Sequence, residues 1–254
     1  MNPKPVYKIL SPAFIDLSVS YRLIRWPKLI PGILVKRYKR FLADIKLDDG
    51  TIITAHCPNS GSMKTCSEPG MGVWISESAN PKRKLSCTWE IIEMPGSMVG
   101  VNAILPNRLV KDAITYGLIQ ELSGYSEIIP EITTSEGTRL DLCLRSHECK
   151  PCYIEIKNST YVEEGRACFP DAVTSRGKKH VEELERLANE GFRSVILFIV
   201  QRMDSECFSP ADHIDPAYGK SLRKAVANGV EIIAYDTLID LKGINIRNKI
   251  PVML

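Results

Sequence analysis

The stretch TRLDLCLRSHECKPCYIEIKN, residues 138–158, decides the fold of the second half of the chain. It holds two short apolar segments joined by a polar linker with a proline, which is the pattern of two strands in a hairpin. Alternate residues of a strand share a face, so Glu155 and Lys157 project together while the isoleucines beside them pack away. The hairpin brings Asp141 next to this pair. We therefore expect two carboxylates and one lysine to converge on the sheet.

These three residues suit the metal-assisted cleavage of a phosphodiester. Asp141 and Glu155 can bind Mg²⁺ or Mn²⁺ through oxygen and leave positions for water and a phosphate oxygen. A bound metal polarises the phosphate and favours hydroxide over water. Lys157 can orient that water, act as a base if its pKa is lowered, or neutralise charge on the phosphate. Glu131 is the expected third metal ligand, with Asp112 as the weaker alternative. The competing interpretation is a structural ion pair at the sheet edge.

The segments around the hairpin predict an α/β domain. The apolar periodicities predict a helix over 109–122, strands over 128–132, 139–144 and 153–157, a helix over 176–189 capped by Ser175, and a strand over 194–201. This order is αβββαβ. A helix over 216–227 and a strand over 230–235 extend it.

The first part of the chain predicts a small β-barrel. Residues 33–47 alternate basic and apolar side chains as one strand, Asp48-Asp49-Gly50 makes a hairpin turn, and 51–56 returns as the next strand. Segments 71–76 and 85–92 supply further strands. This spacing fits an oligonucleotide-binding (OB) barrel, although other small barrels have the same pattern. We place the boundary at 94–97, giving a barrel domain over 1–95 and an α/β domain over 96–254.

Charge divides unevenly between the two expected domains. Residues 1–95 carry 14 Lys and Arg against 8 Asp and Glu, whereas 96–254 carry 19 against 22. A polyanion such as DNA would be drawn to the first part, and the second can gather carboxylates around a cation. The candidate DNA contacts are Lys36, Arg37, Lys39, Arg40, Lys82, Arg83 and Lys84 in the barrel, and Arg176, Lys179 and His180 at the start of a helix. The alternative is scattered solvated charge and an ordinary capped first turn.

The chain begins without the pattern of a secretory signal and contains no apolar run of membrane-spanning length. We therefore expect a cytoplasmic protein without membrane association, whose eight cysteines remain thiols. Cys149 and Cys152 have the spacing of a zinc knuckle or a redox pair, but no second pair accompanies them, so we favour a plain turn.

Two resemblances make these expectations more specific. An Asp followed by Glu-x-Lys on an αβββαβ order resembles the PD-(D/E)xK nuclease superfamily. More narrowly, seven segments in the same order resemble the sugar fermentation stimulation protein A (SfsA) family: 56–63, 80–84, 99–102, 106–110, 153–158, 169–174 and 176–180. This resemblance implies an OB-like domain followed by a PD-(D/E)xK-like domain, and sequence-nonspecific DNA binding with a role in regulating sugar (maltose) metabolism genes.

Three functions stay open at this point. The first is a divalent-metal-dependent nuclease acting on single- or double-stranded DNA. The second is a non-catalytic DNA-binding regulator, and the third is a barrel that binds a carbohydrate or a protein. The intact acid, acid and lysine set favours the nuclease, since a fold used for binding alone has no need of a metal cage. The sequence allows a homodimer and does not require one.

Overall fold

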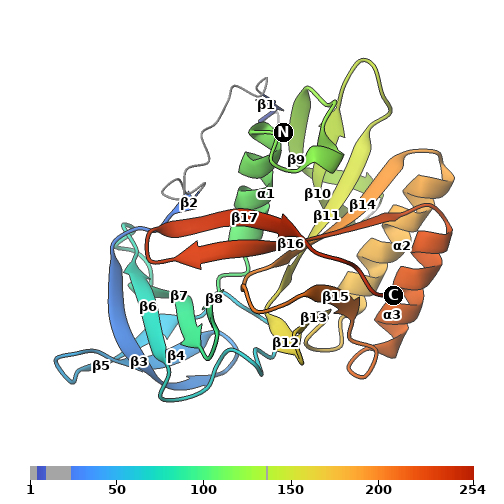
Figure 1. The fold of residues 1–254 in the computed structure, drawn as a ribbon. Helices are drawn as coiled ribbons and strands as arrows, with labels where there is room; N and C mark the ends of the chain where they lie inside the picture. Colours follow the sequence, from blue (N-terminus) through green and yellow to red (C-terminus); the bar gives the residue numbers. More distant parts are fainter. Residues whose placement is uncertain (1–4, 10–23, 136) are drawn as a thin grey trace.

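Alternating apolar residues in the first hundred positions build a β-barrel (Figure 1). The computed structural model describes residues 5–9, 24–135 and 137–254. The barrel strands are β3 (Leu29–Tyr38), β4 (Leu42–Lys46), β5 (Ile52–His56), β6 (Gly72–Glu77), β7 (Cys87–Met94) and β8 (Ser97–Gly100). They form one sheet in the order β5-β4-β3-β6-β7-β8, and a further pairing of β5 with β7 closes it. Trp89, Leu34 and Ile45 are fully buried inside, as the predicted barrel requires.

Two turns of the barrel lie where we did not expect them. The single strand predicted over 33–47 is two strands, because Lys39 and Arg40 adopt positive φ angles of 48° and 63° and reverse the chain between β3 and β4. The segment 94–97, expected at the domain boundary, is the turn between β7 and β8, with Gly96 at φ 87°. The barrel sheet therefore continues to Gly100 rather than ending at residue 95.

The remaining residues build a mixed sheet with helices on both faces. Its elements are α1 (Leu105–Thr115), the short 3₁₀ helix η1 (Gln120–Leu122), β9 (Glu127–Ser135), β10 (Thr138–Arg145), β11 (Cys152–Ser159), α2 (Ser175–Asn189), β14 (Arg193–Val200), α3 (Pro216–Ala227), β16 (Glu231–Asp240) and β17 (Gly243–Lys249). The predicted αβββαβ order is present from α1 to β14. A separate three-stranded sheet contains β12 (Tyr161–Glu163), β13 (Arg166–Phe169) and β15 (Cys207–Pro210), which we did not predict.

The described N-terminal segments belong to this second sheet and not to the barrel. β1 (Tyr7–Lys8) pairs with β9 at one edge, and β2 (Ile24–Arg25) pairs with β17 at the other. The full order is β1-β9-β10-β11-β14-β16-β17-β2. Nearby, the Trp26 indole Nε1 donates a hydrogen bond of 2.7 Å to the Asp240 carbonyl. These long-range pairings leave no mark in the local pattern of residues 1–95.

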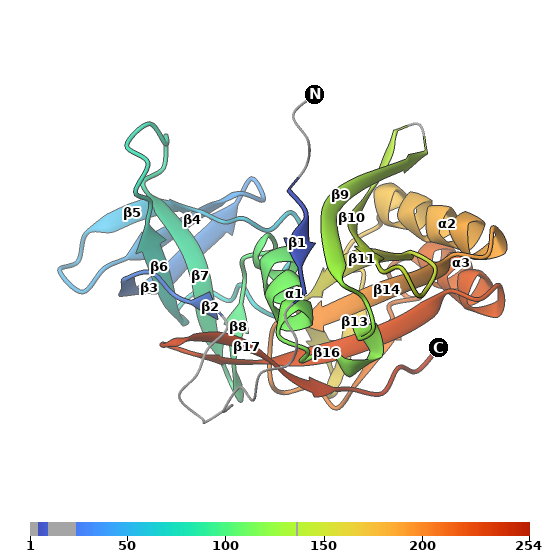
Figure 2. The same cartoon turned by 90° about the horizontal axis from the view of Figure 1, so that it is seen from above.

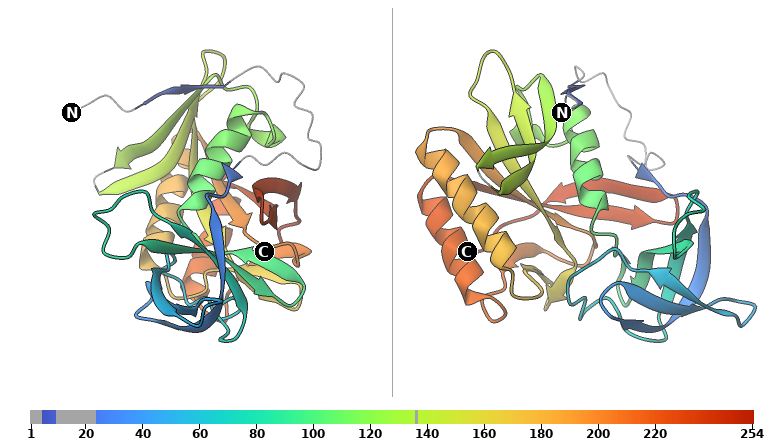
Figure 3. Two further views of the ribbon diagram at one scale, coloured as in Figure 1. Left: turned by 90° about the vertical axis from the view of Figure 1, so that its left-hand side faces the viewer. Right: turned by 180° about the vertical axis from the view of Figure 1, so that it is seen from behind.

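The strand β14 shows how the sheet separates two apolar cores. Val195, Leu197 and Ile199 pack in the core that contains α1, whereas the residues between them pack in the core that contains α2 and α3. Figures 2 and 3 show α1 on one face of the sheet and the other two helices on the opposite face. Burying each such side chain contributes about 1.5–3 kcal/mol. In β11, Ile154 and Ile156 also join the α1 core, which turns Glu155 toward α2.

The helices differ from the predictions mainly at their ends. The helix expected over 109–122 is α1, which starts earlier, with Pro106 in its first turn, and ends at Thr115 before Gly117 at φ 70°. The hydroxyl of Thr174, and not of Ser175, caps α2 by accepting a bond of 3.0 Å from the Gly177 amide. The helix α3 has the predicted bounds. No helix within the described part of the chain is long and apolar enough to span a membrane.

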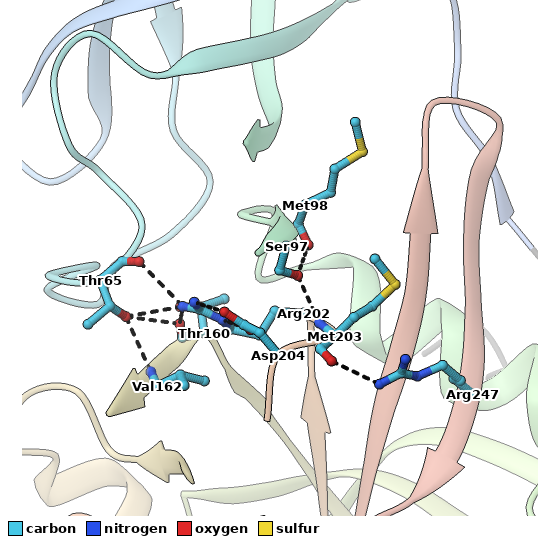
Figure 4. Close-up of polar contacts among 9 residues, drawn as sticks. All are labelled: Thr65, Ser97, Met98, Thr160, Val162, Arg202, Met203, Asp204 and Arg247. Atoms are coloured by element: carbon cyan, nitrogen blue, oxygen red, sulfur yellow. Dashed lines mark hydrogen bonds and ion pairs between the residues drawn. The ribbon is translucent and has the colours of Figure 1, made fainter. Parts of the chain in front are cut away.

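Buried polar contacts join the barrel to the large sheet (Figure 4). The guanidinium of Arg202, just after β14, is 5% exposed and donates to the Thr160 carbonyl at 2.9 Å and to the Thr65 carbonyl in the barrel at 3.3 Å. Asp204 pairs with its other side at 2.6 Å. The Ser97 hydroxyl of β8 accepts a bond of 2.9 Å from the Met203 amide. A fixed contact of this kind sets how the barrel lies against the second sheet.

Candidate active site

Asp141 is held between the neighbouring strand and the first helix. Its Oδ2 accepts a hydrogen bond of 2.8 Å from the Ile156 amide of β11, and its Oδ1 accepts one of 2.8 Å from the Asn107 side chain of α1. Burial, with a further contribution from the charge of Glu155, raises the pKa of Asp141 to about 6. A carboxyl group with this pKa ionises close to neutral pH, where a nearby cation would stabilise its charge.

Glu155 lies at the centre of a buried polar cluster. Its side chain is 5% exposed, and its Oε1 accepts hydrogen bonds from the Lys157 ammonium at 2.6 Å and from Nδ1 of His180. The Nε2 of His180 accepts from Arg176 at 3.5 Å, so Nδ1 is the nitrogen that carries the proton toward Glu155. Burial alone would raise the pKa of Glu155, but the bond from His180 and the charge of Lys157 outweigh it and the pKa is lowered. Glu155 therefore stays ionised where Asp141 takes up a proton.

The state of the second oxygen of Glu155 shows whether a cation would fit beside the two carboxylates. Oε2 is buried and accepts no hydrogen bond from any described residue. A buried carboxylate oxygen in that state costs free energy unless an ion or water pairs with it. Within 5–9, 24–135 and 137–254 no group of three or more His, Cys, Asp or Glu side chains is assembled for a metal. Mg²⁺ commonly uses one or two carboxylates with water and phosphate oxygens, so Asp141 and Glu155 fit it.

Glu131, the expected third ligand, lies on β9. Its neighbours Pro130 and Ile132 pair with Leu142 and Leu140, which places Glu131 across from Asp141. Its side chain is nevertheless 59% exposed, and its carboxylate lies 3.3 Å from the Arg139 guanidinium. Its role as a metal ligand stays a prediction.

The predicted DNA contacts in the barrel differ in how free their charges are. Arg37 donates to three backbone carbonyls of the loop 59–62, at 2.8–3.0 Å, and so serves that loop. Lys36 lies 3.5 Å from the Asp44 carboxylate. Lys39 and Arg40 are exposed in the turn between β3 and β4.

The remaining candidates lie in an exposed loop and on α2. Lys82, Arg83 and Lys84 are exposed, and Arg83 donates to the Thr88 hydroxyl at 3.0 Å. On α2, Arg176 is exposed, as is Lys179, whose ammonium donates to the Gly137 carbonyl at 3.3 Å. His180 is different, because it is 6% exposed and belongs to the buried cluster around Glu155.

Sequence reasoning missed Asn107 as part of the site. Its amide orients Asp141 from the first turn of α1, a turn that we expected to lie before the helix. The only available signal was its place in the segment 106–110 that carries the family resemblance. The spacing of Cys149 and Cys152 led us to expect a turn that contains both residues. In the structure Cys149 is exposed, whereas Cys152 is buried at the start of β11.

Comparison with known proteins covers both parts of the chain. Residues 35–101 match the family described as the SfsA N-terminal OB domain, and residues 104–243 match the sugar fermentation stimulation protein RE domain. Two relatives, both described as sugar fermentation stimulation protein homologs, come from Geobacter metallireducens and Pelobacter propionicus. The first is 54% identical, covering 89% of this chain and 97% of the relative, and the second is 52% identical, covering 91% and 100%.

A solved structure agrees with the fold. Pyrococcus furiosus SfsA in complex with Ca²⁺ superposes with a TM-score of 0.84 and 26% sequence identity, covering 92% of this chain and 100% of that one. The two matched domains follow each other as the barrel and the large sheet do here. The chain therefore belongs to the sugar fermentation stimulation protein family.

Proposed function

We propose that the protein is a divalent-metal-dependent phosphodiesterase that acts on DNA. The observation that carries the proposal is the convergence of Asp141, Glu155 and Lys157, with one oxygen of Glu155 buried and unpaired among the described residues. The P. furiosus relative was solved with Ca²⁺, which has the same preference for oxygen ligands as Mg²⁺. The charge of Glu155 helps to raise the pKa of Asp141, which is the kind of repulsion that a bound cation relieves.

Each residue of the cluster has a distinct role in this proposal. Asp141 and Glu155 hold the cation, which when bound polarises the phosphate and makes hydroxide available at neutral pH. Lys157, on the same face of β11, neutralises charge that develops on the phosphate oxygens. His180 keeps Glu155 ionised and in place by donating from Nδ1. Asn107 holds Asp141 in place by donating to its Oδ1.

DNA is the proposed substrate because both parts of the molecule carry exposed cations. Lys39 and Arg40 lie in one exposed barrel turn, and Lys82 and Lys84 lie in another loop. Arg176 is exposed on the first turn of α2, the helix that carries His180. Exposed lysines and arginines bind a phosphate backbone without regard to base sequence.

A nuclease assay on single-stranded and duplex DNA with Mg²⁺ or Mn²⁺ tests the proposal. We expect cleavage by the wild type and a loss of at least about a hundredfold in Lys157→Ala and Asp141→Ala. Lys178→Ala is the matched control, because this lysine is exposed on α2 and pairs with Glu182. Cleavage that survives in both active-site variants would show that another site is responsible. A wild type that binds DNA without cutting it would favour the regulator.

A further inference from the structure

A cavity of about 520 Å³ lies between the barrel and the large sheet. The barrel supplies the loop 59–62 together with Arg37 and Arg40. The large-sheet part supplies Asn158 at the end of β11 and the segment 169–174 that leads into α2. Neither part alone encloses this space.

Three segments that line the cavity continue in the chain into residues of the candidate active site. Asn158 directly follows Lys157 on β11. Thr174, another lining residue, caps the helix that carries His180. Ala103, on a third wall, lies one turn of chain before Asn107. The cavity and the cluster around the two carboxylates are therefore built on the same stretches of the chain.

The barrel wall of the cavity is fixed before any ligand arrives. Besides the three bonds from Arg37, the Asn59 side chain accepts from the Gly61 amide at 2.9 Å and donates to the Val101 carbonyl at 3.2 Å. The Met63 amide donates to Asp171 at 3.0 Å, which ties this loop to the opposite wall. Gly61 packs so closely that a Cβ there would lie 2.4 Å from the Asp171 carboxylate. A preorganised wall loses little conformational entropy on binding.

The chemistry of the lining fits a nucleotide. The lining contains two arginines, Arg37 and Arg40, and one carboxylate, Asp171, so its net formal charge is positive. Ser60, Ser62 and Asn158 add polar side chains to the lining. Phe169 and Pro170 add an apolar wall. The arginines thus suit a phosphate, the polar side chains suit the edge of a base, and Phe169 with Pro170 suits its flat face.

Two exposed apolar side chains border this space. Val173 lines the cavity and is 77% exposed, and Ile104, next to the lining residue Ala103, is 71% exposed. They are the most exposed large hydrophobic side chains in the described ranges. Apolar side chains presented in this way wedge between DNA bases and part them from their neighbours.

We propose that the cavity takes one unpaired nucleotide of the DNA, so that the protein selects strands with unpaired bases over a blunt duplex. The proposal rests on DNA being the substrate and adds which DNA is preferred. A space of this volume suits a ligand of roughly drug size, about 300–1,000 Å³, and cannot admit a base pair within a helix. Extracting a base from a duplex costs a few kcal/mol, a cost that an unpaired base avoids.

Fluorescence anisotropy with three labelled DNAs tests the proposal: a single strand, a blunt duplex, and the same duplex with a short unpaired tail. The measurements use Ca²⁺ in place of Mg²⁺ to suppress cleavage. We expect the tailed and single-stranded DNAs to bind about tenfold more tightly than the blunt duplex. Arg40→Gln and Ala172→Phe, which remove a lining cation and fill the space, should bring this ratio close to one. Circular dichroism checks that both variants are folded.

Lys39→Gln is the matched control, because Lys39 shares the exposed turn and the positive φ of Arg40 but does not line the cavity. It should weaken binding of all three DNAs alike and keep their ratio. Equal binding of the three DNAs by the wild type overturns the proposal, as does a ratio that both cavity variants leave unchanged. Selective binding without cleavage would contradict the proposed phosphodiesterase activity and support the proposed nucleotide site. Cleavage without selectivity would support the activity and contradict the nucleotide site.

Discussion

Replacing Asp141 by asparagine should make the protein more stable at pH 8 when no divalent metal is bound. In the folded chain the pKa of Asp141 is raised from its ordinary value of 3.8 to about 6. The folded state therefore holds the proton more tightly than the unfolded chain, and the free energy of unfolding falls as pH rises from about 4 to 6. At about 1.4 kcal/mol for each pH unit, the ionised carboxylate costs the folded state about 3 kcal/mol above that range.

Asparagine removes this charge and keeps most of the contacts. Its oxygen can still accept from the Ile156 amide, while its new amino group faces Asn107, which must turn its own oxygen inward. This exchange costs about 1 kcal/mol. The net gain at pH 8 is about 2 kcal/mol. Near pH 4 the wild-type carboxyl is protonated, so the gain should vanish.

Urea unfolding at pH 4.5 and pH 8, with a chelator present, measures the difference. Asp212→Asn is the control, because Arg223 lowers the pKa of this exposed carboxylate and its loss should bring no gain at pH 8. Adding Mn²⁺ should stabilise the wild type and leave Asp141→Asn unchanged. The reasoning fails if the variant is the less stable protein at pH 8, or if its advantage is the same at both pH values.

Three further changes probe other parts of the molecule. Arg202→Met should lower the free energy of unfolding by about 3–5 kcal/mol, since it leaves buried partners unpaired, and a loss below about 1 kcal/mol in urea unfolding would contradict this. His180→Ala should raise the pKa of Glu155 toward that of Asp141, so that the acid limb of the cleavage pH profile, which Asp141 sets in the wild type, becomes steeper, with His180→Gln changing it less; an acid limb of unchanged slope refutes the role. The double change of Lys82 and Lys84 to Gln should reduce the slope of log affinity against log salt by about 2, and an equal slope excludes both as phosphate contacts.

The convergence of Asp141, Glu155 and Lys157 could be predicted because it depends on neighbours in the sequence. Strand alternation alone turns Glu155 and Lys157 to one face, and a single hairpin brings the β10 strand of Asp141 beside them. The helix α3 was predicted with its bounds for the same reason, since Pro216 and Gly229 mark its two ends. In each case a short stretch of residues holds the whole signal.

What failed depends on contacts between distant residues. β1 and β2 are two residues each, and only the edges of a sheet formed more than a hundred residues later give them partners. The turn at Lys39 and Arg40 contains no glycine or asparagine, so its left-handed conformation is imposed by the pairing of β3 with β4. Asn107 reaches Asp141 only because α1 packs on β11.

Residue type alone predicted more DNA-binding cations than the structure leaves free. Arg37 has the same charge as Arg40, yet its guanidinium donates hydrogen bonds to the carbonyls of the loop 59–62 and so holds one wall of the cavity in shape. Since Arg40 comes from the barrel and Asn158 from the large sheet, the cavity depends on the bonds that hold the two together, of which the contact around Arg202 is the most buried and the Met63–Asp171 bond is another. The carboxylates lie wholly within the large sheet. Weakening the contact should therefore impair selection of the DNA before it impairs cleavage.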